Sequence, residues 1–306
     1  MSLFLKLVLA HLIGDFILQF EELYRLKVRS TLGHFFHALI HAVVSLVLVA
    51  PYLKNPAVTP VPPAVIVVNI GNGDGDVSIL DTDADALRAR IASNGEHVKV
   101  IGYVYTSLGA RADADIKTSI DRYLTARNGS VHYDGIFFDE VPRDCGPTAG
   151  SMAWRDKYRA LREYVWTKIP NVADLVVNNV GTAVSDCYLQ TGHETADTFV
   201  TFEGSALSYL TDAATVGWAY GWVGGNVISN GQYVIGTQYG SWRFWHLVYD
   251  ARAANWQTIV DTAFARYAGY IDATDDYYTN TWLNPWDAKP TYLSDETEYA
   301  SNVSGP

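Results

Sequence analysis

Three carboxylates stand at the ends of two apolar runs of the chain. Asp139 and Glu140 close the run DGIFFDE, and Glu203 closes the run TFVTFE. Two carboxyl groups about 5 to 9 Å apart can break a glycosidic bond, because one protonates the leaving oxygen while the other attacks the anomeric carbon or activates water. The competing interpretation is structural: Asp139 would cap the next turn, and Glu203 would pair with a Lys or Arg. The spacing alone leaves both interpretations open.

The elements that position these acids are predicted to be alternating strands and helices. Short runs rich in β-branched and aromatic residues alternate with amphipathic stretches, a pattern typical of parallel β/α construction. Eight such runs predict an α/β fold, a (β/α)8 TIM-like barrel, regular or irregular. They are Val65–Asn69, Val98–Thr106, Asp134–Glu140, Asp174–Val180, Thr198–Glu203, Tyr233–Tyr239, Phe244–Asp250 and Gly269–Asp276.

Helices are predicted at Asp83–Ser93, Asp113–Arg127, Ala153–Lys168 and Ala253–Tyr267, where apolar residues return every three or four positions. The stretch Leu207–Gly231 is rich in Gly and Trp and is interpreted as an irregular insertion. The seventh strand follows the sixth too closely for an intervening helix, so one of the two is a candidate for a hairpin.

Polar residues gather at the carboxyl ends of the predicted strands, where the active sites of β/α barrels lie. Besides the three acids, Asn69, Tyr105, Asn178 with Asn179, Asp250, and Asp275 with Asp276 hold such positions. Some of these residues are expected to be loop caps. The aromatic residues Tyr105 and Tyr239 at strand ends are candidates to pack against sugar rings. His246, inside an apolar strand, is interpreted as a core histidine.

The chain has two cysteines, Cys145 and Cys187. They follow the third and fourth predicted strands, in loops that would be neighbours at the same end of the barrel. We therefore predict a disulfide between them, with two unpaired thiols as the alternative.

Residues 1–54 have a different character from the rest of the chain. Two apolar stretches, each near the roughly 20 residues that span a bilayer, predict a helical membrane hairpin. A cleaved signal sequence is the alternative, and either reading places the remainder outside the cytoplasm, anchored or secreted. A Pro-rich linker at residues 55–64 then leads into a barrel domain at residues 65–306. His11, Asp15, His34, His37 and His41 could share helical faces as a metal or proton site, or simply hydrogen-bond within the hairpin.

Charge narrows the partners that the barrel domain can have. Residues 1–54 carry five basic and three acidic residues, a net charge of +2, which leaves −13 for the remainder of a chain whose net charge is −11. Such a body is a poor partner for nucleic acid, whose binding depends on basic residues. It suits a neutral or cationic substrate better. We expect a monomer that uses neither a metal nor an organic cofactor.

Several blocks resemble, in order, the spherulin-4 family. They are HVKVIGYVYTSLGAR, IDRY, DGIFFDEVP, VNNVGT, FVTFE, ATDD and NPWDAKPTYL, between about residues 65 and 296. The resemblance implies a β/α-barrel glycoside hydrolase that cleaves within galactosamine-containing polysaccharides, including galactosaminogalactan, with a role in biofilm remodelling among the possibilities. A non-catalytic carbohydrate-binding surface barrel is the alternative.

The resemblance also assigns roles to individual residues. Its FFDE block falls on Asp139 and Glu140, and its later strand-end acid falls on Glu203. Asp139 is then expected to be the nucleophile or base, Glu203 the general acid and Glu140 a supporting carboxylate. The expected substrate contacts are Asn69, Tyr105, Asn178, Tyr239 and Asp275. Separately, LAHLIGDFILQ and HFFHALIHA resemble, over about the first 50 residues, an uncharacterised family of small bacterial membrane proteins.

Overall fold

The computed structural model describes residues 64–70, 73, 89, 98–125, 133–169, 175–211, 221–277, 284–286 and 290–302. The predicted hairpin at residues 1–54, with its His/Asp cluster, lies outside the described residues. So do almost all of the predicted linker at residues 55–64 and of the predicted helix Asp83–Ser93. None of the helices in the described ranges combines the length and the apolar character needed to cross a bilayer.

A parallel sheet forms the centre of the molecule, with the strand order β1-β2-β3-β4-β6-β9-β10. Every neighbouring pair in this sheet runs parallel. Parallel strands need long crossover connections, and helices supply several of them here. The seven strands are β1 (Ala64–Val68), β2 (Val98–Tyr105), β3 (Gly135–Asp139), β4 (Leu175–Asn179), β6 (Thr198–Ser205), β9 (Phe244–Tyr249) and β10 (Tyr270–Ala273).

The prediction of a barrel strand at Tyr233–Tyr239 is wrong. In its place β8 (Gln232–Val234) pairs antiparallel with β7 (Val227–Ser229), which pairs with β5 (Val184–Ser185) in a separate small sheet. The chain from Val234 to Phe244 is too short for a covering helix, so this run forms a hairpin instead of a crossover. The described sheet therefore has seven strands, and within the described residues no pairing joins β1 to β10.

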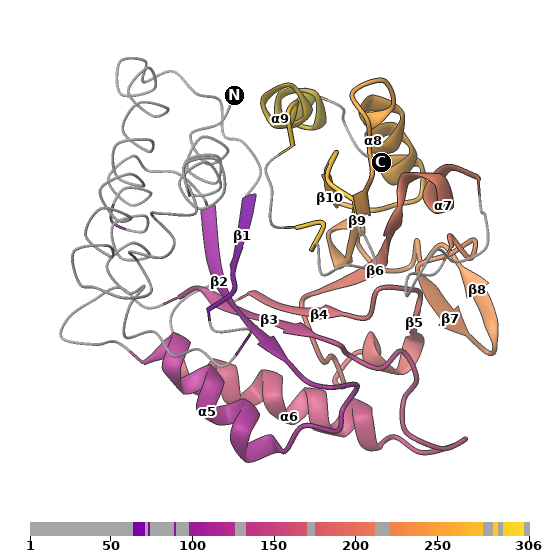
Figure 1. Ribbon diagram of the computed structural model, residues 1–306. Helices are drawn as coiled ribbons and strands as arrows, with labels where there is room; N and C mark the ends of the chain where they lie inside the picture. Colours follow the sequence, from indigo (N-terminus) through magenta and orange to yellow (C-terminus); the bar gives the residue numbers. More distant parts are fainter. Residues whose placement is uncertain are drawn as a thin grey trace.

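The sheet is strongly curled, as Figure 1 shows from β1 and β2 through β3 and β4 to β9 and β10. The rings of Phe137 in β3 and Trp245 in β9 lie 6.1 Å apart, edge to face. Two strands separate β3 from β9 in the sheet order, so in a flat sheet these residues would be roughly 14 Å apart. The contact shows that the concave face folds back on itself like the inside of a barrel. The apolar side chains of that face form one cluster: Ile101, Phe137, Leu175, Val177, Val200, Trp245 and Leu247.

Helices cover the convex face of the sheet (Figure 1). The helices α5 (Asp113–Leu124) and α6 (Ala153–Lys168) pack beside each other over one half. The helices α7 (Ala206–Thr211), α8 (Trp256–Ala265) and α9 (Leu293–Asn302) cover the other half. Gly102 of β2 permits the close approach of α5, because a Cβ atom there would lie 2.3 Å from the ring of Tyr123. Two short 3-10 helices, η3 (Asp186–Tyr188) and η4 (Ser241–Arg243), complete the described elements.

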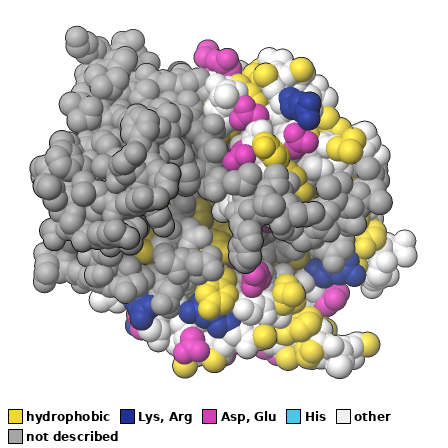
Figure 2. Space-filling model, in the orientation of Figure 1, with side chains coloured by type: hydrophobic (Ala, Val, Ile, Leu, Met, Phe, Trp, Pro, Cys, Tyr) yellow, Lys and Arg dark blue, Asp and Glu magenta, His cyan; other side chains and the backbone are white. Residues whose placement is uncertain are grey.

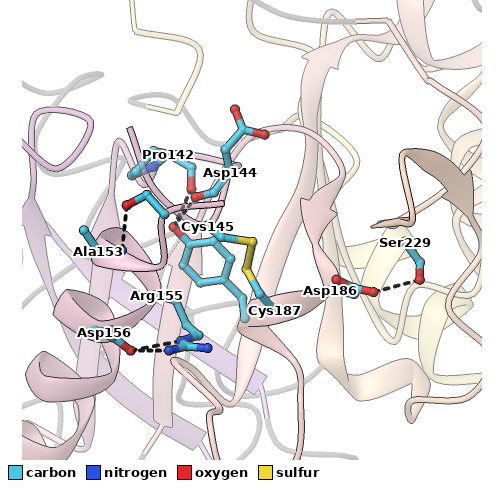
Figure 3. The surroundings of a disulfide bond; sticks show 11 residues. Pro142, Asp144, Cys145, Ala153, Arg155, Asp156, Asp186, Cys187 and Ser229 are labelled. Atoms are coloured by element: carbon cyan, nitrogen blue, oxygen red, sulfur yellow. Dashed lines mark hydrogen bonds and ion pairs between the residues drawn. A yellow bond between two sulfur atoms is a disulfide. The ribbon is translucent and has the colours of Figure 1, made fainter. Parts of the chain in front are cut away.

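The predicted disulfide between Cys145 and Cys187 is present, with 6.1 Å between the Cα atoms (Figure 3). It joins the loop after β3 to η3, which follows β4 and β5 along the chain. Beside it, the hydroxyl group of Tyr188 donates to the carbonyl oxygens of Pro142 and Asp144, at 3.0 and 2.9 Å. The loop that leaves β3 is thus held by covalent and hydrogen bonds next to its strand end.

Candidate active site

Glu203 faces the concave interior because β6 contains a bulge. In the register with β9, Val200 pairs with Trp245 and Phe202 with His246, which leaves Thr201 as an extra residue. Side chains alternate along a regular strand, so Val200 and Glu203, three positions apart, would otherwise face opposite sides. The extra residue turns Phe202 into the helical layer and returns Glu203 to the interior, where 8 % of its surface remains exposed.

Asp139 is the last residue of β3, and the side chain of Thr106 holds its backbone in place. The hydroxyl oxygen of Thr106 lies 2.8 Å from the carbonyl oxygen of Asp139 and 2.9 Å from that of Glu140. The hydroxyl group of Tyr158 on α6 lies 2.6 Å from the same Thr106 oxygen. Glu140 has a positive φ of 55°, which marks the point where the chain leaves the strand direction. The carboxylate of Asp139 is therefore presented from a rigid strand end.

A single amide nitrogen joins the two acids. Asn179 Nδ2, at the end of β4, donates to Asp139 Oδ1 at 2.8 Å and to Glu203 Oε2 at 2.7 Å. Taken together, these two bond lengths limit the separation of the two carboxylate oxygens to at most 5.5 Å. The strands β3, β4 and β6 are consecutive in the sheet, so the three side chains converge from neighbouring strand ends.

Two aromatic side chains supply the remaining donors of this site. The phenol of Tyr103 in β2 donates to Asp139 Oδ2 at 2.5 Å. The indole Nε1 of Trp286 donates to Glu203 Oε1 at 2.9 Å, and its ring packs edge to face against Tyr249 of β9 at 6.3 Å. All four carboxylate oxygens of the pair thus accept a hydrogen bond, which fixes both groups in position.

Both acids have a higher pKa than an ordinary carboxyl group. Burial, followed by the charge of Asp139, raises the pKa of Glu203 to about 7, although hydrogen bonds from Asn179 and Trp286 oppose this shift. Burial also raises the pKa of Asp139, against hydrogen bonds from Tyr103, from the backbone of Glu140 and from Asn179. Two carboxyl groups so close together in a desolvated site share one proton more readily than they both ionise.

Tyr103 remains a donor throughout the neutral range. Burial, then the charge of Asp139, raises the pKa of its phenol far above the ordinary value. A phenol that keeps its proton favours the ionised form of the carboxylate that it faces. Tyr103 thus acts against protonation of Asp139.

Two other predicted residues, Glu140 and Tyr105, border this centre, and their side chains make none of the hydrogen bonds described above. The side chain of Glu140 is exposed, because it follows Asp139 on the opposite side of the strand end. Tyr105 aligns with Asp139 in the register of β2 and β3, and it lies beside Gly73 together with Tyr103. The guanidinium group of Arg111 stacks 4.3 Å from the ring centre of Tyr105. Tyr105 therefore lies at the rim of the site.

The structure places Asn178 away from the site that its neighbour occupies. Asn178 is fully buried and donates from Nδ2 to Thr195 Oγ1 at 3.2 Å. Val176 and Asn178 point to the convex side of β4, whereas Val177 and Asn179 point to the concave side. Asn178, predicted as a substrate contact, therefore does not reach the acids, whereas its neighbour Asn179 does.

Tyr239 also lies elsewhere. Its ring packs on the apolar cluster beneath α5 and α6, and burial and then the charge of Asp186 raise the pKa of its hydroxyl group. It precedes β9, near Arg243, and therefore lies toward the amino end of that strand and not at its carboxyl end. The short hairpin in place of the predicted strand explains why Tyr239 lies away from the acids.

Asn69 and Asp275 are bound to the chain itself. Asn69 Oδ1 accepts a hydrogen bond from the backbone of Gly73 at 2.9 Å, which stabilises the turn after β1. Asp275, after β10, accepts hydrogen bonds from the backbone and hydroxyl of Thr291 at 3.1 and 2.5 Å. Thr291 lies five positions after Trp286 in the sequence, so Asp275 holds the chain at a point close to the residue that carries the indole.

Sequence reasoning missed the precise roles of Asn179, Tyr103 and Trp286. The sequence does contain a signal for Asn179 and Tyr103. Each occupies an inward-facing position on a predicted strand, and each of these strands neighbours a strand that carries Asp139 or Glu203. Assignment of the two faces of each strand would have found them. The sequence around Trp286 shows no periodicity that points to an interior position. The interpretation of His246 as a core residue is confirmed, because its two ring nitrogens lie 2.6 Å from the Tyr209 hydroxyl group and 2.8 Å from Asn226 Oδ1.

Comparison with known proteins agrees with this fold. The sequence model of the Spherulation-specific family 4 matches residues 52–300, and the chain belongs to this family, as its motifs predicted. A second model, described as a protein of unknown function (DUF3307), matches residues 3–69. None of the curated proteins matches the chain. Among solved structures, Aspergillus clavatus Sph3 in complex with GalNAc aligns with a TM-score of 0.57 and 20% identity, over 78% of this chain and 85% of that chain. At that identity the likeness establishes a shared α/β fold.

Proposed function

We propose that the chain is a glycoside hydrolase that cleaves within galactosamine-containing polysaccharides. The observation that carries this proposal is the placement of Asp139 and Glu203 on one donor, Asn179 Nδ2, with their oxygens at most 5.5 Å apart. Paired carboxyl groups at about this distance are the chemical requirement for glycosidic cleavage. The competing reading from sequence, in which Glu203 pairs with a cation, finds no support in the described contacts, where both of its oxygens accept from neutral N–H groups.

The environments of the two acids support different roles. Glu203, with a pKa raised to about 7, retains a proton near neutrality and serves as the general acid for the leaving oxygen. Burial raises the pKa of Asp139, but hydrogen bonds from Tyr103, the backbone of Glu140 and Asn179 oppose that rise and favour the ionised form. Asp139 serves as the nucleophile or base. Glu140 supports the site through its charge at the rim.

The separation of the acids favours retention of configuration. Retaining enzymes hold their carboxyl groups about 5 to 5.5 Å apart, whereas inverting enzymes leave about 6.5 to 9.5 Å for a water molecule. Asp139 Oδ1 and Glu203 Oε2 are at most 5.5 Å apart, which is less than the separation that inverting enzymes need. We therefore propose that Asp139 attacks the anomeric carbon and that a covalent intermediate is then hydrolysed by water.

The substrate class follows from the family and from the surroundings of the acids. The related structure of Sph3 was solved with GalNAc, which supports an amino sugar as the unit that this site binds. Tyr103, Tyr105, Tyr249 and Trp286 lie around or beside the acids, and aromatic faces with polar edges suit sugar rings.

We also propose that the protein acts outside the cytoplasm, through a membrane hairpin or after secretion. The disulfide between Cys145 and Cys187 supports this location, because disulfides persist in oxidising compartments and are rare in the cytosol. Membrane attachment through residues 1–54, a monomeric state and a role in biofilm remodelling remain proposals of the same kind.

The test is incubation of the full chain with galactosaminogalactan, chitosan and a neutral galactan, followed by mass analysis of soluble oligosaccharides. We expect a ladder of products from galactosaminogalactan alone, and its loss in Asp139→Asn and Glu203→Gln. A non-catalytic binding protein is the second candidate. Retention of the polymer without new reducing ends, equal in wild type and both variants, would establish that role instead.

A further inference from the structure

A glutamate lies in the middle of the apolar face of α9. Tyr292, just before this helix, and Tyr299 and Ala300 within it pack on the apolar cluster under α8. Glu296 lies between them, with 4 % of its surface exposed. Residues three and four positions apart share one face of a helix, so Glu296 faces inward with these apolar side chains. The described acidic side chains drawn in Figure 2 instead reach solvent among basic and hydrophobic ones.

Glu296 takes the place of a strand partner at one edge of β10. This strand is last in the order of the sheet, with β9 as its neighbour, and the N–H of Thr274 donates to Val248 of β9 at 2.9 Å. Backbone N–H groups alternate between the two edges of a strand, so the N–H of Ala273 points to the other edge. There it donates to Glu296 Oε1 at 3.0 Å. The side chain of Glu296 thus satisfies a backbone donor that an open strand edge would expose.

The second carboxyl oxygen of Glu296 has no partner. Oε2 is buried and makes no hydrogen bond with the described residues. The charged side chains that act on Glu296 are Asp272 in β10 and Asp275 after it, and both are acidic. Tyr292 is close enough to respond to the charge of Glu296, and its own hydroxyl group donates to the carbonyl oxygen of Ala251. The surroundings of Glu296 therefore oppose a negative charge.

The basic and metal-binding groups of the described chain do not balance this acid. On α8, Asp261 accepts a hydrogen bond from the Tyr299 hydroxyl group at 2.9 Å. Before α8, the exposed side chain of Arg252 pairs with Asp250 at 3.5 Å. No three His, Cys, Asp or Glu side chains come together as metal ligands in the part of the chain that the structure describes. A buried carboxylate without a cation is costly, so a proton is left as the group that neutralises Glu296.

The shifts of pKa agree with this placement. Burial, followed by the charge of Asp272, raises the pKa of Glu296 well above its ordinary value of 4.5, although the hydrogen bond from Ala273 opposes the shift. Burial raises the pKa of Asp272 to about 6. Loss of the proton from Glu296 would place a second negative charge beside Asp272 in a desolvated position, which is unfavourable on both counts.

We propose that Glu296 is a pH-sensitive latch, which holds α9 against β10 while it carries a proton and releases the helix once that proton is lost. In the released helix Glu296 is hydrated, and its pKa is ordinary. The closed state therefore binds the proton more tightly, and its advantage is lost as the pH rises through the raised pKa. Release uncovers the edge of β10 that α9 covers in Figure 1. The latch needs no substrate, so it does not depend on the proposed hydrolase activity.

Hydrogen exchange of the full chain, read by mass spectrometry of its peptides, tests this inference. Protection factors are measured at pH 5 and pH 9, after correction for the intrinsic exchange rate at each pH. At pH 9 we expect protection of α9 and β10 to fall at least about tenfold, the effect of one pKa unit, while β3 and β4 keep theirs. Glu296→Gln resembles the protonated acid and cannot ionise, so it should retain its protection at both values. The matched control, Glu298→Gln, removes an exposed carboxylate from the same helix and should behave as wild type.

Three results would overturn the inference. They are full protection of α9 in wild type at pH 9, an equal loss of protection in Glu296→Gln, and an equal loss in β3 and β4, which would indicate global unfolding. Asp272→Asn provides a second variant if Glu296→Gln does not fold. It removes the charge beside Glu296 and should reduce the loss of protection at pH 9, and an undiminished loss in this variant would count against the latch.

Discussion

Trp286 Nε1 and Glu203 Oε1 are 2.9 Å apart, although 83 positions separate the two residues in the chain. The indole belongs to the described residues 284–286, after β10, and Asp275 binds Thr291 a little further along the chain. A strand-end acid is thus completed by a residue from the far end of the domain. The protonation of Glu203 consequently depends on how that late segment docks.

Replacement of Trp286 should shift the pH profile of hydrolysis. The indole hydrogen bond lowers the pKa of Glu203, so Trp286→Phe is expected to raise that pKa by about one unit, equivalent to about 1.4 kcal/mol. The alkaline limb of kcat/KM should move upward accordingly. Initial rates measured between pH 5 and pH 9 in wild type and variant provide the test. An unmoved limb accompanied by a uniform loss of rate would show that Trp286 contributes only to packing.

The pair Asn178 and Asn179 offers a matched comparison within one strand. Asn179→Ala removes the shared donor of both acids, and we expect kcat to fall about a hundredfold, as for other preorganised donors in active sites. Asn178→Ala affects a buried side chain on the opposite face, so it should lower the melting temperature while kcat changes little. Steady-state kinetics and thermal melts of the two variants decide the matter. Equal kinetic losses would contradict the assignment of the two faces.

The raised pKa of Glu203 predicts how stability depends on pH. Its pKa rises from the ordinary 4.5 to about 7 in the folded protein, so the folded state binds this proton more tightly than the unfolded chain does. Its contribution to the free energy of unfolding is present below pH 4.5 and is lost as the pH rises through 7. Glu203→Gln carries no charge at any pH. The melting temperature of this variant, relative to wild type, should therefore be higher at pH 8 than at pH 5. A difference independent of pH would show that Glu203 titrates normally.

The disulfide should contribute substantially to stability. Cys145 and Cys187 are 42 residues apart, and a cross-link over a loop of this length contributes roughly 2–4 kcal/mol. The double variant Cys145→Ser/Cys187→Ser should therefore lose about that much free energy of unfolding in urea titrations. Because the bond also restrains the loop after Asp139, we expect a lower kcat as well. Unchanged stability would indicate that the hydrogen bonds of Tyr188 suffice to hold this loop.

The sequence predicted most of the sheet, because each barrel strand is a short apolar run bounded by polar residues. Strands β3, β4 and β9 begin and end within one residue of their predicted limits, and α6 agrees at both ends. Asp139 and Glu203 were identified as a pair for the same reason: both follow a strong strand. The disulfide followed from the loop order.

The differences between the predicted and the observed site share one physical cause. Strand register, hairpin pairing and long-range contacts decide where a side chain lies, and residue types alone do not determine them. In VVNN, two identical amides occupy opposite faces, and only the register with β3 decides which of them reaches Asp139. Tyr239 resembles a strand-end aromatic residue, but its run is paired into a hairpin by β7. Trp286 is held by its hydrogen bond to Glu203 and its ring contact with Tyr249, and the sequence around it has no periodic pattern that predicts these contacts.

Because β6 has a bulge at Thr201, the meeting of Glu203 with Asp139 depends on backbone geometry as well as on residue identity. Without the bulge, the same sequence in β6 would turn Phe202 inward and Glu203 outward among the helices. Asp139 would then face an aromatic ring. The hydroxyl of Thr201, which donates to Asn226 Oδ1 at 2.9 Å, secures the irregularity on the outer side. We therefore expect homologues that keep the glutamate but lack the bulge to fold and yet to lack the proposed activity, so the presence of the acids alone does not identify an active member.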